Sequence, residues 1–411
     1  MKKYIEAIKN YSKSTYKQMT REPSGYLKHP FIVPGSSRYS NCLWDWDSWL
    51  TNVAVRQIMN DNRDYDEKFI KCEKGCVINF LEHISPLGRI PIAITPDYCE
   101  DNAPDSNCHK PCLAQHIAFI INAEKGDAQW LNPYFDDLKK FISYYIDNCF
   151  HKATGLFFWL DDGAIGVDND PCTFYRPNKS SASIYLNCLM YKELLAMEYI
   201  CTVLKKDASY YKACADKLKE SIRCNLWDER NGFYYSADLN LKPVDPSEKR
   251  HSGAPRHWDC LIQRIDVWSG FMAMWAEIAT EEQAERMVRE NMINTKTFWS
   301  EHGVRTLSKL EKMYSIKKTG NPSCWLGPIW GVSNWMCFEG LVKYGYEKEA
   351  ALLAEKTIAL FGRDIIECGE MHEYYNPDIY AGVNNQGFQN WNLLVNNMIA
   401  WIEKRPVVWE F

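Results

Sequence analysis

Hydrophobic residues recur along most of the chain at the three- and four-residue spacing of helices, whereas strand-like alternation is sparse. This pattern predicts helices arranged in pairs, with short turns inside a pair and longer loops between pairs. The predicted helices span residues 3–19, 46–60, 65–83, 112–124, 133–149, 181–204, 207–224, 265–278, 281–292, 329–344, 347–361 and 390–402. Helix-start residues support several of them, such as Asn132–Pro133 and Thr280 with the acidic residues that follow it.

The longer loops fall at 85–111, 150–180, 226–262, 294–327 and 362–389. No low-complexity linker divides the chain and no repeat is visible in it. We therefore expect an all-α protein built from six helical hairpins, forming a single domain over residues 1–411 with residues 1–38 as an N-terminal helix and lead-in segment. Hairpins arranged in a ring would place one set of loops around a common mouth, where binding and catalysis concentrate.

Charge and composition exclude several partners. The 411 residues carry a net charge of −5 without a long block of one sign, which argues against nucleic acid or an anionic membrane as the main partner. No apolar run approaches the roughly 20 residues that span a bilayer. The basic amino terminus lacks the apolar stretch of a signal peptide. Sixteen scattered cysteines fit a reduced cytoplasmic protein whose thiols pack in the core.

Two groups of potential metal ligands occur in the loops: Cys99, Cys108, His109 and Cys112, and Asp161, Asp162, Asp168 and Asp170. The first group lacks the paired C-x2-C spacing of common zinc sites. The second lacks the alternating order of a calcium-binding EF-hand loop. We therefore expect neither a metal nor an organic cofactor.

Aromatic residues are abundant, with 16 Trp, 24 Tyr and 17 Phe. Most should pack in the core. Others stand beside acidic or amide residues in loops, as in LWDWDSW, EYYNP and FQNWN. Flat rings stack on the apolar faces of sugars, and neighbouring polar groups can bind hydroxyls, so these loops are candidates for a sugar site.

Two acidic residues fit the chemistry of glycosidic bond hydrolysis, which needs carboxyl groups on opposite sides of the sugar. Asp168 in GVDNDP and Glu373 in MHEYYNPD have apolar or aromatic neighbours, and burial can raise a carboxyl pKa toward the range that acid catalysis needs. Other interpretations are that GVDNDP is a turn whose side chains bond its own backbone and that Glu373 is a solvated acid. Asp45 or Asp47 could similarly cap a helix.

The motifs LWDWDSW, GVDNDP, NPSCWLGPIWGVSNWMCFEGL and MHEYYNPD…GFQNW resemble, in this order, motifs of glycoside hydrolase family 63, and most resemble its compact bacterial mannosylglycerate and glucosylglycerate hydrolases. The resemblance runs from about residue 39 to residue 400, and RIDVWSGFMAMWAEIA and FWSEHGVRTLS also resemble the related trehalases. It implies an (α/α)6 barrel and hydrolysis with inversion. Asp168 would be the general acid and Glu373 the general base, about 6.5–9.5 Å apart to leave room for water.

The same resemblance implies a set of substrate-binding residues. Trp44 and Trp46 would wall the −1 sugar site, and Asp45 or Asp47 would accept sugar hydroxyls. Gln115, in the KPCLAQH segment, matches an amide position near the substrate. The other implied residues are Asn169 beside the acid, Trp325, Gly327 and Trp330 in the WLGPIW loop, and Gln389 and Trp391 at the last side of the pocket.

A glycerate-like aglycone would need hydroxyl or cationic partners, for which Tyr39, Tyr375, Arg176 and Lys179 are candidates; a structural role is the favoured alternative for Arg176. Two departures from the family pattern concern this part of the site. Many relatives carry W-R-G-P where this chain has Trp325–Pro328 with leucine at 326, and a Thr-Gly pair is replaced at 379–382. Both put the aglycone preference in doubt rather than the two carboxyl groups.

The sequence therefore predicts an inverting α-glycosidase acting on a small soluble α-glycoside, glucosyl or mannosyl and with glycerate among the candidate aglycones. The first alternative is an α-glucosidase or trehalase-like disaccharide hydrolase, and the second is a non-catalytic sugar-binding protein on the same fold. A phosphorylase would need a phosphate pocket beside Glu373, and an isoprenoid cyclase would need aspartate-rich magnesium motifs on helices. Neither feature is found in the sequence.

Overall fold

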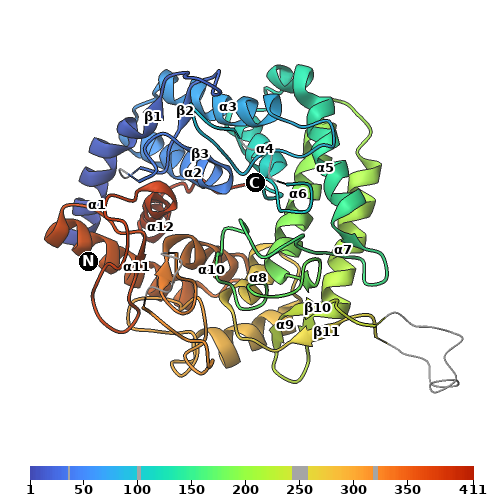
Figure 1. The fold of residues 1–411 in the computed structure, drawn as a ribbon. Helices are drawn as coiled ribbons and strands as arrows, with labels where there is room; N and C mark the ends of the chain where they lie inside the picture. Colours follow the sequence, from blue (N-terminus) through green and yellow to red (C-terminus); the bar gives the residue numbers. More distant parts are fainter. Residues whose placement is uncertain (36–37, 100–102, 243–257, 318–322) are drawn as a thin grey trace, which may run out of the picture.

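The computed structural model describes residues 1–411 except 36–37, 100–102, 243–257 and 318–322 (Figure 1). Most of it is helical, and the helices follow the predicted order. The α-helices are α1 (Lys2–Thr15), α2 (Asp45–Asn62), α3 (Glu67–Glu82), α4 (Leu113–Ala123), α5 (Phe135–Asn148), α6 (Ile184–Val203), α7 (Ser209–Leu226), α8 (Met272–Trp275), α9 (Glu281–Arg286), α10 (Gly331–Lys343), α11 (Glu347–Cys368) and α12 (Val395–Ile402).

Several predicted boundaries differ from the observed ones. The helix predicted at 265–278 consists of a 3-10 turn, Trp268–Phe271, and the single turn α8. The segment after α9 continues as a π-helix, Met287–Met292. Helix α11 runs on to Cys368 and ends where Gly369 takes a left-handed conformation with φ of 79°.

Short antiparallel strands, absent from the prediction, join the helices. They are β1 (Thr20–Arg21), β2 (Phe31–Ile32), β3 (Leu43–Trp44), β4 (Ala93–Ile94), β5 (Phe150–His151), β6 (Leu156–Phe157), β7 (Ser181–Ala182), β8 (Trp227–Asp228), β9 (Phe233–Tyr234), β10 (Ser236–Asp238), β11 (Leu261–Gln263), β12 (Ile329–Trp330) and β13 (Tyr374–Tyr375). Strand β3 pairs with β4, and β12 pairs with β13 with Trp330 opposite Tyr374. These two pairs position the candidate site.

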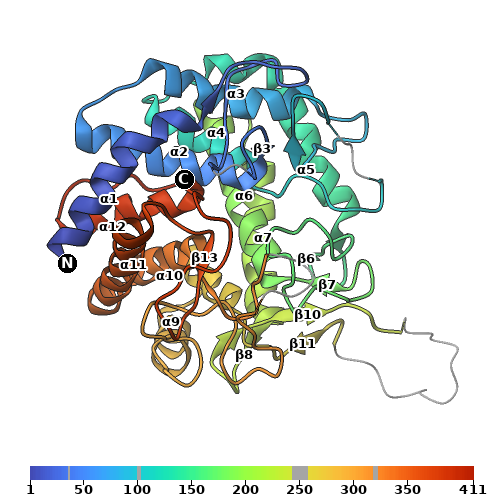
Figure 2. The same cartoon turned by 60° about the vertical axis from the view of Figure 1, so that its left-hand side comes forward.

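The even-numbered helices form a closed circle of neighbours. Helices α2, α4, α6, α8, α10 and α12 contact one another in that order, and α12 contacts α2 (Figure 1). Other helices pack outside this circle: α3 against α2 and α4, α7 against α6, and α11 against α10 and α12. Helix α1 packs against α11 and α12, as the rotated view shows (Figure 2).

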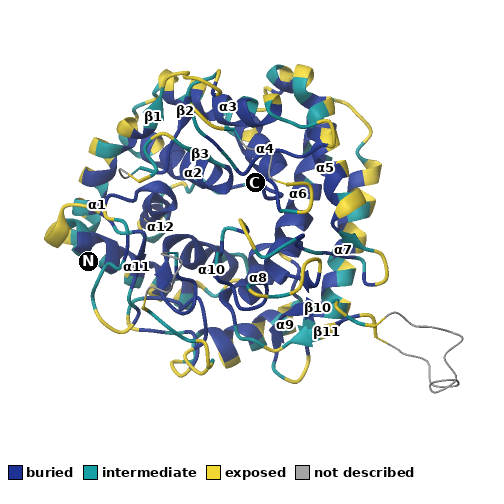
Figure 3. Cartoon of the chain, in the orientation of Figure 1, coloured by how far each residue is buried: buried dark blue, intermediate teal, exposed yellow. Residues whose placement is uncertain are grey.

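The sequence pattern explains which helices lie inside. Every residue of α10 from Gly331 to Leu341 is buried, because its neighbours surround it. Helix α7 instead buries one stripe at helical spacing: Tyr211, Ala215, Leu218, Ile222 and Leu226. Figure 3 shows this difference, with most of α10 buried and the outward surface of α7 partly exposed.

Helix starts test the predicted caps. Thr280 accepts a hydrogen bond from the Gln283 N–H, and the Gln283 side chain accepts one from the Thr280 N–H, so a complete capping box begins α9. The expectation that Asp45 or Asp47 caps α2 is wrong. The helix already begins at Asp45, and its N-cap residue is Trp44, whose side chain makes no capping hydrogen bond.

Two further observations bear on the environment of the protein. All sixteen cysteines are in the thiol form. In the part of the chain that the structure describes, no helix has the length and apolar character needed to cross a membrane.

Candidate active site

A cavity of about 240 Å³ contains both candidate catalytic carboxyl groups. They come from distant loops, Asp168 between β6 and β7 and Glu373 directly before β13. Among the described residues, the cavity is lined by Tyr39, Trp44, Trp46, Asp47, Ile92, Lys110, Ala164, Gly166, Asp168, Ser323, Trp330, Glu373, Phe388 and Trp391.

Aromatic rings form much of the wall. Trp44 ends β3 and Trp330 ends β12, so each is positioned by a pair of short strands. The Trp46 and Trp391 ring centroids lie 5.0 Å apart. Trp330 stacks on Tyr374 with ring centroids 4.8 Å apart. The rings predicted from LWDWDSW, WLGPIW and GFQNW thus meet around one space.

Glu373 is buried and held by side chains on both oxygens. Only 4% of it is exposed. Asn384 Nδ2 donates to Oε2 at 2.9 Å and the Tyr39 hydroxyl donates to Oε1 at 3.3 Å. Burial raises the pKa of Glu373, and the nearby charge of Asp168 raises it further, while Arg38 and the Tyr39 hydrogen bond oppose the shift. A carboxyl group with a raised pKa is suited to proton transfer near neutral pH.

Side chains, rather than regular structure, hold the Asp168 loop. The Asn169 Oδ1 accepts a hydrogen bond of 2.7 Å from the Trp325 N–H. Asp170 accepts from the Cys172 N–H and the Thr173 hydroxyl, and burial raises its pKa to about 6. The GVDNDP segment is therefore a turn, as one interpretation expected, and it also carries a carboxyl group into the cavity.

Gly166 permits close approach between this loop and the cavity wall. Its φ is +87°, and a Cβ atom there would lie 2.5 Å from Cε of Lys110 and 3.2 Å from the Trp46 ring. A larger residue would push the Asp168 loop away from these two side chains.

The two aspartates of LWDWDSW have opposite environments. Lys110 Nζ lies 2.8 Å from both carboxylate oxygens of Asp45, and the Lys110 N–H donates to Asp45 Oδ2 at 3.0 Å. Burial opposes ionisation of Asp45, but these contacts outweigh it and lower its pKa. Asp47 accepts from Asn390, and burial with the charge of Asp45 raises its pKa to about 8. Asp47 lines the cavity, whereas Asp45 does not line it and forms an ion pair with Lys110.

Some predicted substrate-binding residues lie outside the cavity lining. The Gln115 amide donates to the carbonyl oxygens of Pro111 and Leu189 between α4 and α6. Arg176 forms an ion pair with Asp238. These hydrogen bonds give both side chains structural roles, and for Arg176 this was the favoured alternative.

Tyr375 is also directed elsewhere. Adjacent strand residues face opposite sides, so Tyr374 stacks on Trp330 while the Tyr375 hydroxyl donates to Asp364 of α11 at 2.7 Å. The structure therefore does not bring Tyr375 to the cavity as a partner for an aglycone.

The remaining predicted residues lie behind the wall. Trp325 is buried and stacks on Trp330 with centroids 4.0 Å apart. Gly327 has a φ of +136°, and an added Cβ would collide with the Tyr314 ring, so its close neighbour is this ring rather than a sugar. Asn169 and Gln389 are buried beside the cavity and do not line it.

Other lining residues were missed in the sequence. They are Ile92, Lys110, Ala164, Gly166, Ser323 and Phe388. Lys110 begins the KPCLAQH segment, in which only Gln115 was predicted to contact the substrate. Phe388 belongs to GFQNW, in which only the polar residue and the tryptophan were selected.

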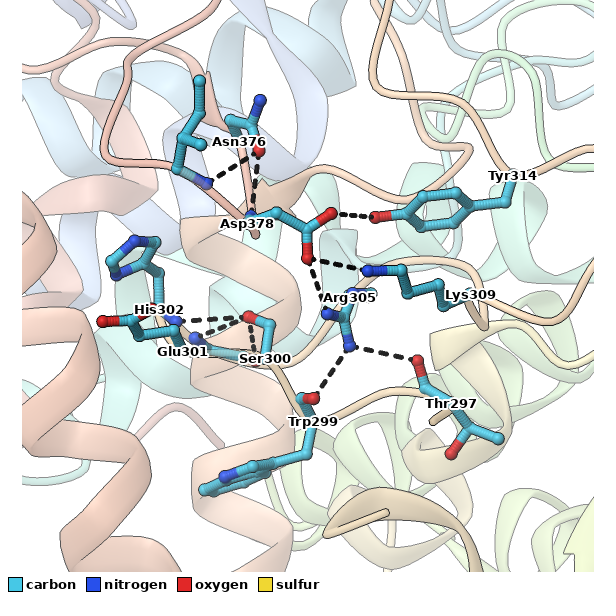
Figure 4. A network of polar contacts seen from close by, with 12 residues as sticks. Thr297, Trp299, Ser300, Glu301, His302, Arg305, Lys309, Tyr314, Asn376 and Asp378 are labelled. Carbon is cyan, nitrogen blue, oxygen red and sulfur yellow. Dashed lines mark hydrogen bonds and ion pairs between the residues drawn. The ribbon is translucent and has the colours of Figure 1, made fainter. Parts of the chain in front are cut away.

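A polar network fixes the turn that follows Glu373 (Figure 4). Asp378 accepts from Arg305 at 2.9 Å, Lys309 at 3.2 Å and the Tyr314 hydroxyl at 3.4 Å. Arg305 also donates to the Trp299 carbonyl at 2.8 Å. This network ties the Asn-Pro-Asp turn to the loop at residues 297–314, which approaches the WLGPIW segment through Tyr314.

The two groups of potential metal ligands are not gathered into clusters among the described residues. His109 packs edge-on against Phe80 and Phe141, its Nδ1 lies 2.6 Å from the Lys110 carbonyl oxygen, and burial lowers its pKa to about 4. Within the described ranges, no three His, Cys, Asp or Glu residues are grouped to hold a metal ion. Neither the cysteine–histidine set nor the aspartate set forms such a group.

Two carboxyl groups in one aromatic-walled cavity, on a mostly helical domain, are the features of a glycoside hydrolase. Comparison with known families agrees with this class. Residues 39–391 match the family model described as the mannosylglycerate hydrolase MGH1-like glycoside hydrolase domain. The chain therefore belongs to the MGH1-like glycoside hydrolase family.

Similarity to individual proteins is more distant. The cytosolic neutral trehalase of Kluyveromyces lactis is 25% identical over 253 residues, covering 58% of this chain and 31% of that protein. Mannosylglycerate hydrolase MGH2 of Selaginella moellendorffii is 25% identical over 433 residues, covering 91% of this chain and 82% of that protein. The chain thus spans about a third of the length of that trehalase.

A solved structure has the same fold. The family 63 mannosylglycerate hydrolase of Thermus thermophilus, in complex with Tris and D-glycerate, has a TM-score of 0.71 at 16% identity, covering 95% of this chain and 99% of that chain. At this identity the likeness shows the fold alone.

Proposed function

We propose that this glycoside hydrolase is an inverting α-glycosidase of small α-glycosides, with Asp168 as general acid and Glu373 as general base. The observation that carries the proposal is that these two residues line one cavity although they come from separate loops. The circle of even-numbered helices with its outer partners supports an (α/α)6 barrel over residues 1–411 as the scaffold.

The proposed roles follow from the surroundings of each carboxyl group. The hydrogen bonds from Asn384 and Tyr39 leave Glu373 fixed in orientation, as a base that aligns a water molecule must be. Asp168 is less buried than Glu373 and comes from a separate loop. It protonates the leaving oxygen while Glu373 takes a proton from the attacking water, and the product has inverted configuration.

The transferred sugar is a glucosyl or mannosyl unit, and mannosylglycerate is one candidate substrate because relatives bear that name. A trehalase-like reaction on a neutral disaccharide is the second candidate. One observation supports this second candidate. Arg176 is paired with Asp238 and Tyr375 with Asp364, so two residues predicted to bind glycerate have other partners. The reduced thiols support our prediction of a cytoplasmic location.

The test is hydrolysis of a panel of α-glucosides and α-mannosides that includes both glycerates and trehalose. Asp168→Asn and Glu373→Gln should each lower kcat by about 10²- to 10⁴-fold on the best substrate. Asp162→Asn and Glu370→Gln, which change acids of the same two segments outside the cavity lining, are the matched controls. If Asp168→Asn or Glu373→Gln retained wild-type turnover, the role proposed for that residue would be disproved. The anomer formed first, followed by NMR, tests inversion separately.

A further inference from the structure

Lys110 combines burial, charge and a position at the cavity. Its side chain is 2% exposed. Among the described residues that line the cavity, it is the basic one, and its Nζ lies 5.5 Å from the centroid of the Trp46 ring. Its Cε is the atom closest to the position that a Cβ on Gly166 would occupy. Lys110 therefore lies where the acid loop, the aromatic wall and the start of α2 meet.

The hydrogen bonds of Lys110 leave donor capacity unused. An ammonium group carries three N–H donors. In the described part of the chain, all hydrogen bonds of Nζ go to Asp45, whose two oxygens lie on one side of the nitrogen at 2.8 Å. Asp45 in turn also accepts from the Lys110 and Trp46 backbone N–H groups. Asp45 thus fixes the position of the ammonium group without consuming every donor.

A purely structural ion pair is a weak explanation for this arrangement. Removing two charges from water costs several kcal/mol, and apolar residues of similar size often replace a buried pair without loss of stability. A pair beside a sugar-binding wall has a further use, because a fixed ammonium group forms strong charge-assisted hydrogen bonds to hydroxyl groups.

We infer that Lys110 is a substrate-binding, specificity-determining residue that donates a hydrogen bond to one hydroxyl of the glycosyl unit, with Asp45 as its positioning partner. This inference rests on the proposed function, because it requires a glycosyl unit between Asp168 and Glu373. Asp45 balances the charge of Lys110, so the pair recognises a neutral hydroxyl rather than a carboxylate.

The test combines enzyme variants with substrate analogues. Wild type, Lys110→Gln and the double variant Lys110→Gln/Asp45→Asn are assayed on the best glycoside and on its monodeoxy analogues, each lacking one hydroxyl of the glycosyl unit. In the wild type, one analogue should lose roughly 10- to 100-fold in kcat/KM through loss of the charged hydrogen bond. In both variants that loss should shrink to a few-fold, while the losses at the other hydroxyls stay unchanged.

The double variant keeps the test valid if Lys110→Gln alone fails to fold, because it removes the pair as a unit. If each analogue lost as much kcat/KM with the variants as with the wild type, the inference would be overturned and the proposed function would stand. A wild-type protein that hydrolyses no glycoside of the panel would overturn the proposed function and the inference with it.

Discussion

The two candidate catalytic carboxyl groups reach one cavity by different structural means. Glu373 directly precedes a strand whose backbone pairs with β12, and the following turn is fixed by the Asp378 network. Asp168 lies in a long loop without regular structure, held by single contacts such as Asn169 to Trp325 and Gly166 against Lys110. The Glu373 segment is thus anchored by strand pairing next to it, whereas the Asp168 loop is held by turn and side-chain contacts.

This difference matters for the proposed mechanism, in which the two groups have different tasks. A base that orients water needs a constant position, and a strand pair provides it. The acid must follow the leaving oxygen of the aglycone, and loops accommodate such variation better than paired strands do. Changes near Asp168 should therefore alter catalysis through geometry, and changes near Glu373 through its protonation.

The largest expected effect separates the two roles directly. A leaving group that departs without protonation, as in an α-glycosyl fluoride, should restore Asp168→Asn by about 10²- to 10⁴-fold relative to a natural glycoside. It should not restore Glu373→Gln, because water still needs a base. Steady-state hydrolysis of both substrates by both variants measures this. Rescue of Glu373→Gln alone would mean that the roles are reversed.

The next effect concerns the side chains that hold the Asp168 loop. Asn169→Ala should lower kcat by roughly tenfold, since it removes the acceptor of the buried Trp325 N–H, a loss worth about 1–3 kcal/mol. Asn169→Asp, which retains an acceptor oxygen, is the matched comparison. An unchanged kcat in Asn169→Ala would show that this contact does not position Asp168.

Asp170, the buried acid of the same loop, should make the folding stability depend on pH. Burial raises the pKa of Asp170 to about 6, above the unfolded value of about 3.9. The folded protein therefore holds this proton more tightly, and stability falls as the pH rises from about 4 to 6.

Asp170→Asn should remove that part of the pH dependence, so its stability relative to wild type should improve by about 2 kcal/mol between roughly pH 4 and pH 8. Urea unfolding at both pH values measures it. A difference that does not change with pH would show that Asp170 keeps its ordinary pKa in the folded protein.

The smallest effect tests the base. The Tyr39 hydroxyl donates to Glu373 and favours its charged form. Tyr39→Phe should therefore raise the pKa of Glu373 and move the acidic limb of the kcat/KM profile toward higher pH. Phe388→Leu, at another aromatic residue of the wall, controls for general disturbance. A shift toward lower pH would contradict the assignment of Glu373 as base.

The sequence predicted the helices and the motifs that meet at the cavity, because helical periodicity and carboxyl–aromatic motifs are local patterns. It failed where orientation depends on packing. Two-residue strands carry no periodicity, so nothing in EYYNP indicated that Tyr374 faces the wall and Tyr375 faces α11. Gln115 was selected for its amide, whose partners in α6 appear only once the helices are packed. Lys110 was missed because its partner Asp45 is distant in sequence.

The contact between Asp47 and Asn390 joins α2 to the segment that precedes α12, and Thr51 reaches the same Asn390 at 2.9 Å. These hydrogen bonds cross the junction where the circle of helices closes. Part of the cavity wall, including Trp46 and Trp391, therefore comes from the two sides of that junction, which folding brings together only by closing a loop that includes most of the chain. Recovery of hydrolytic activity after dilution from denaturant should then lag behind recovery of the helical circular dichroism signal. The rate at which activity returns would measure the final step of folding.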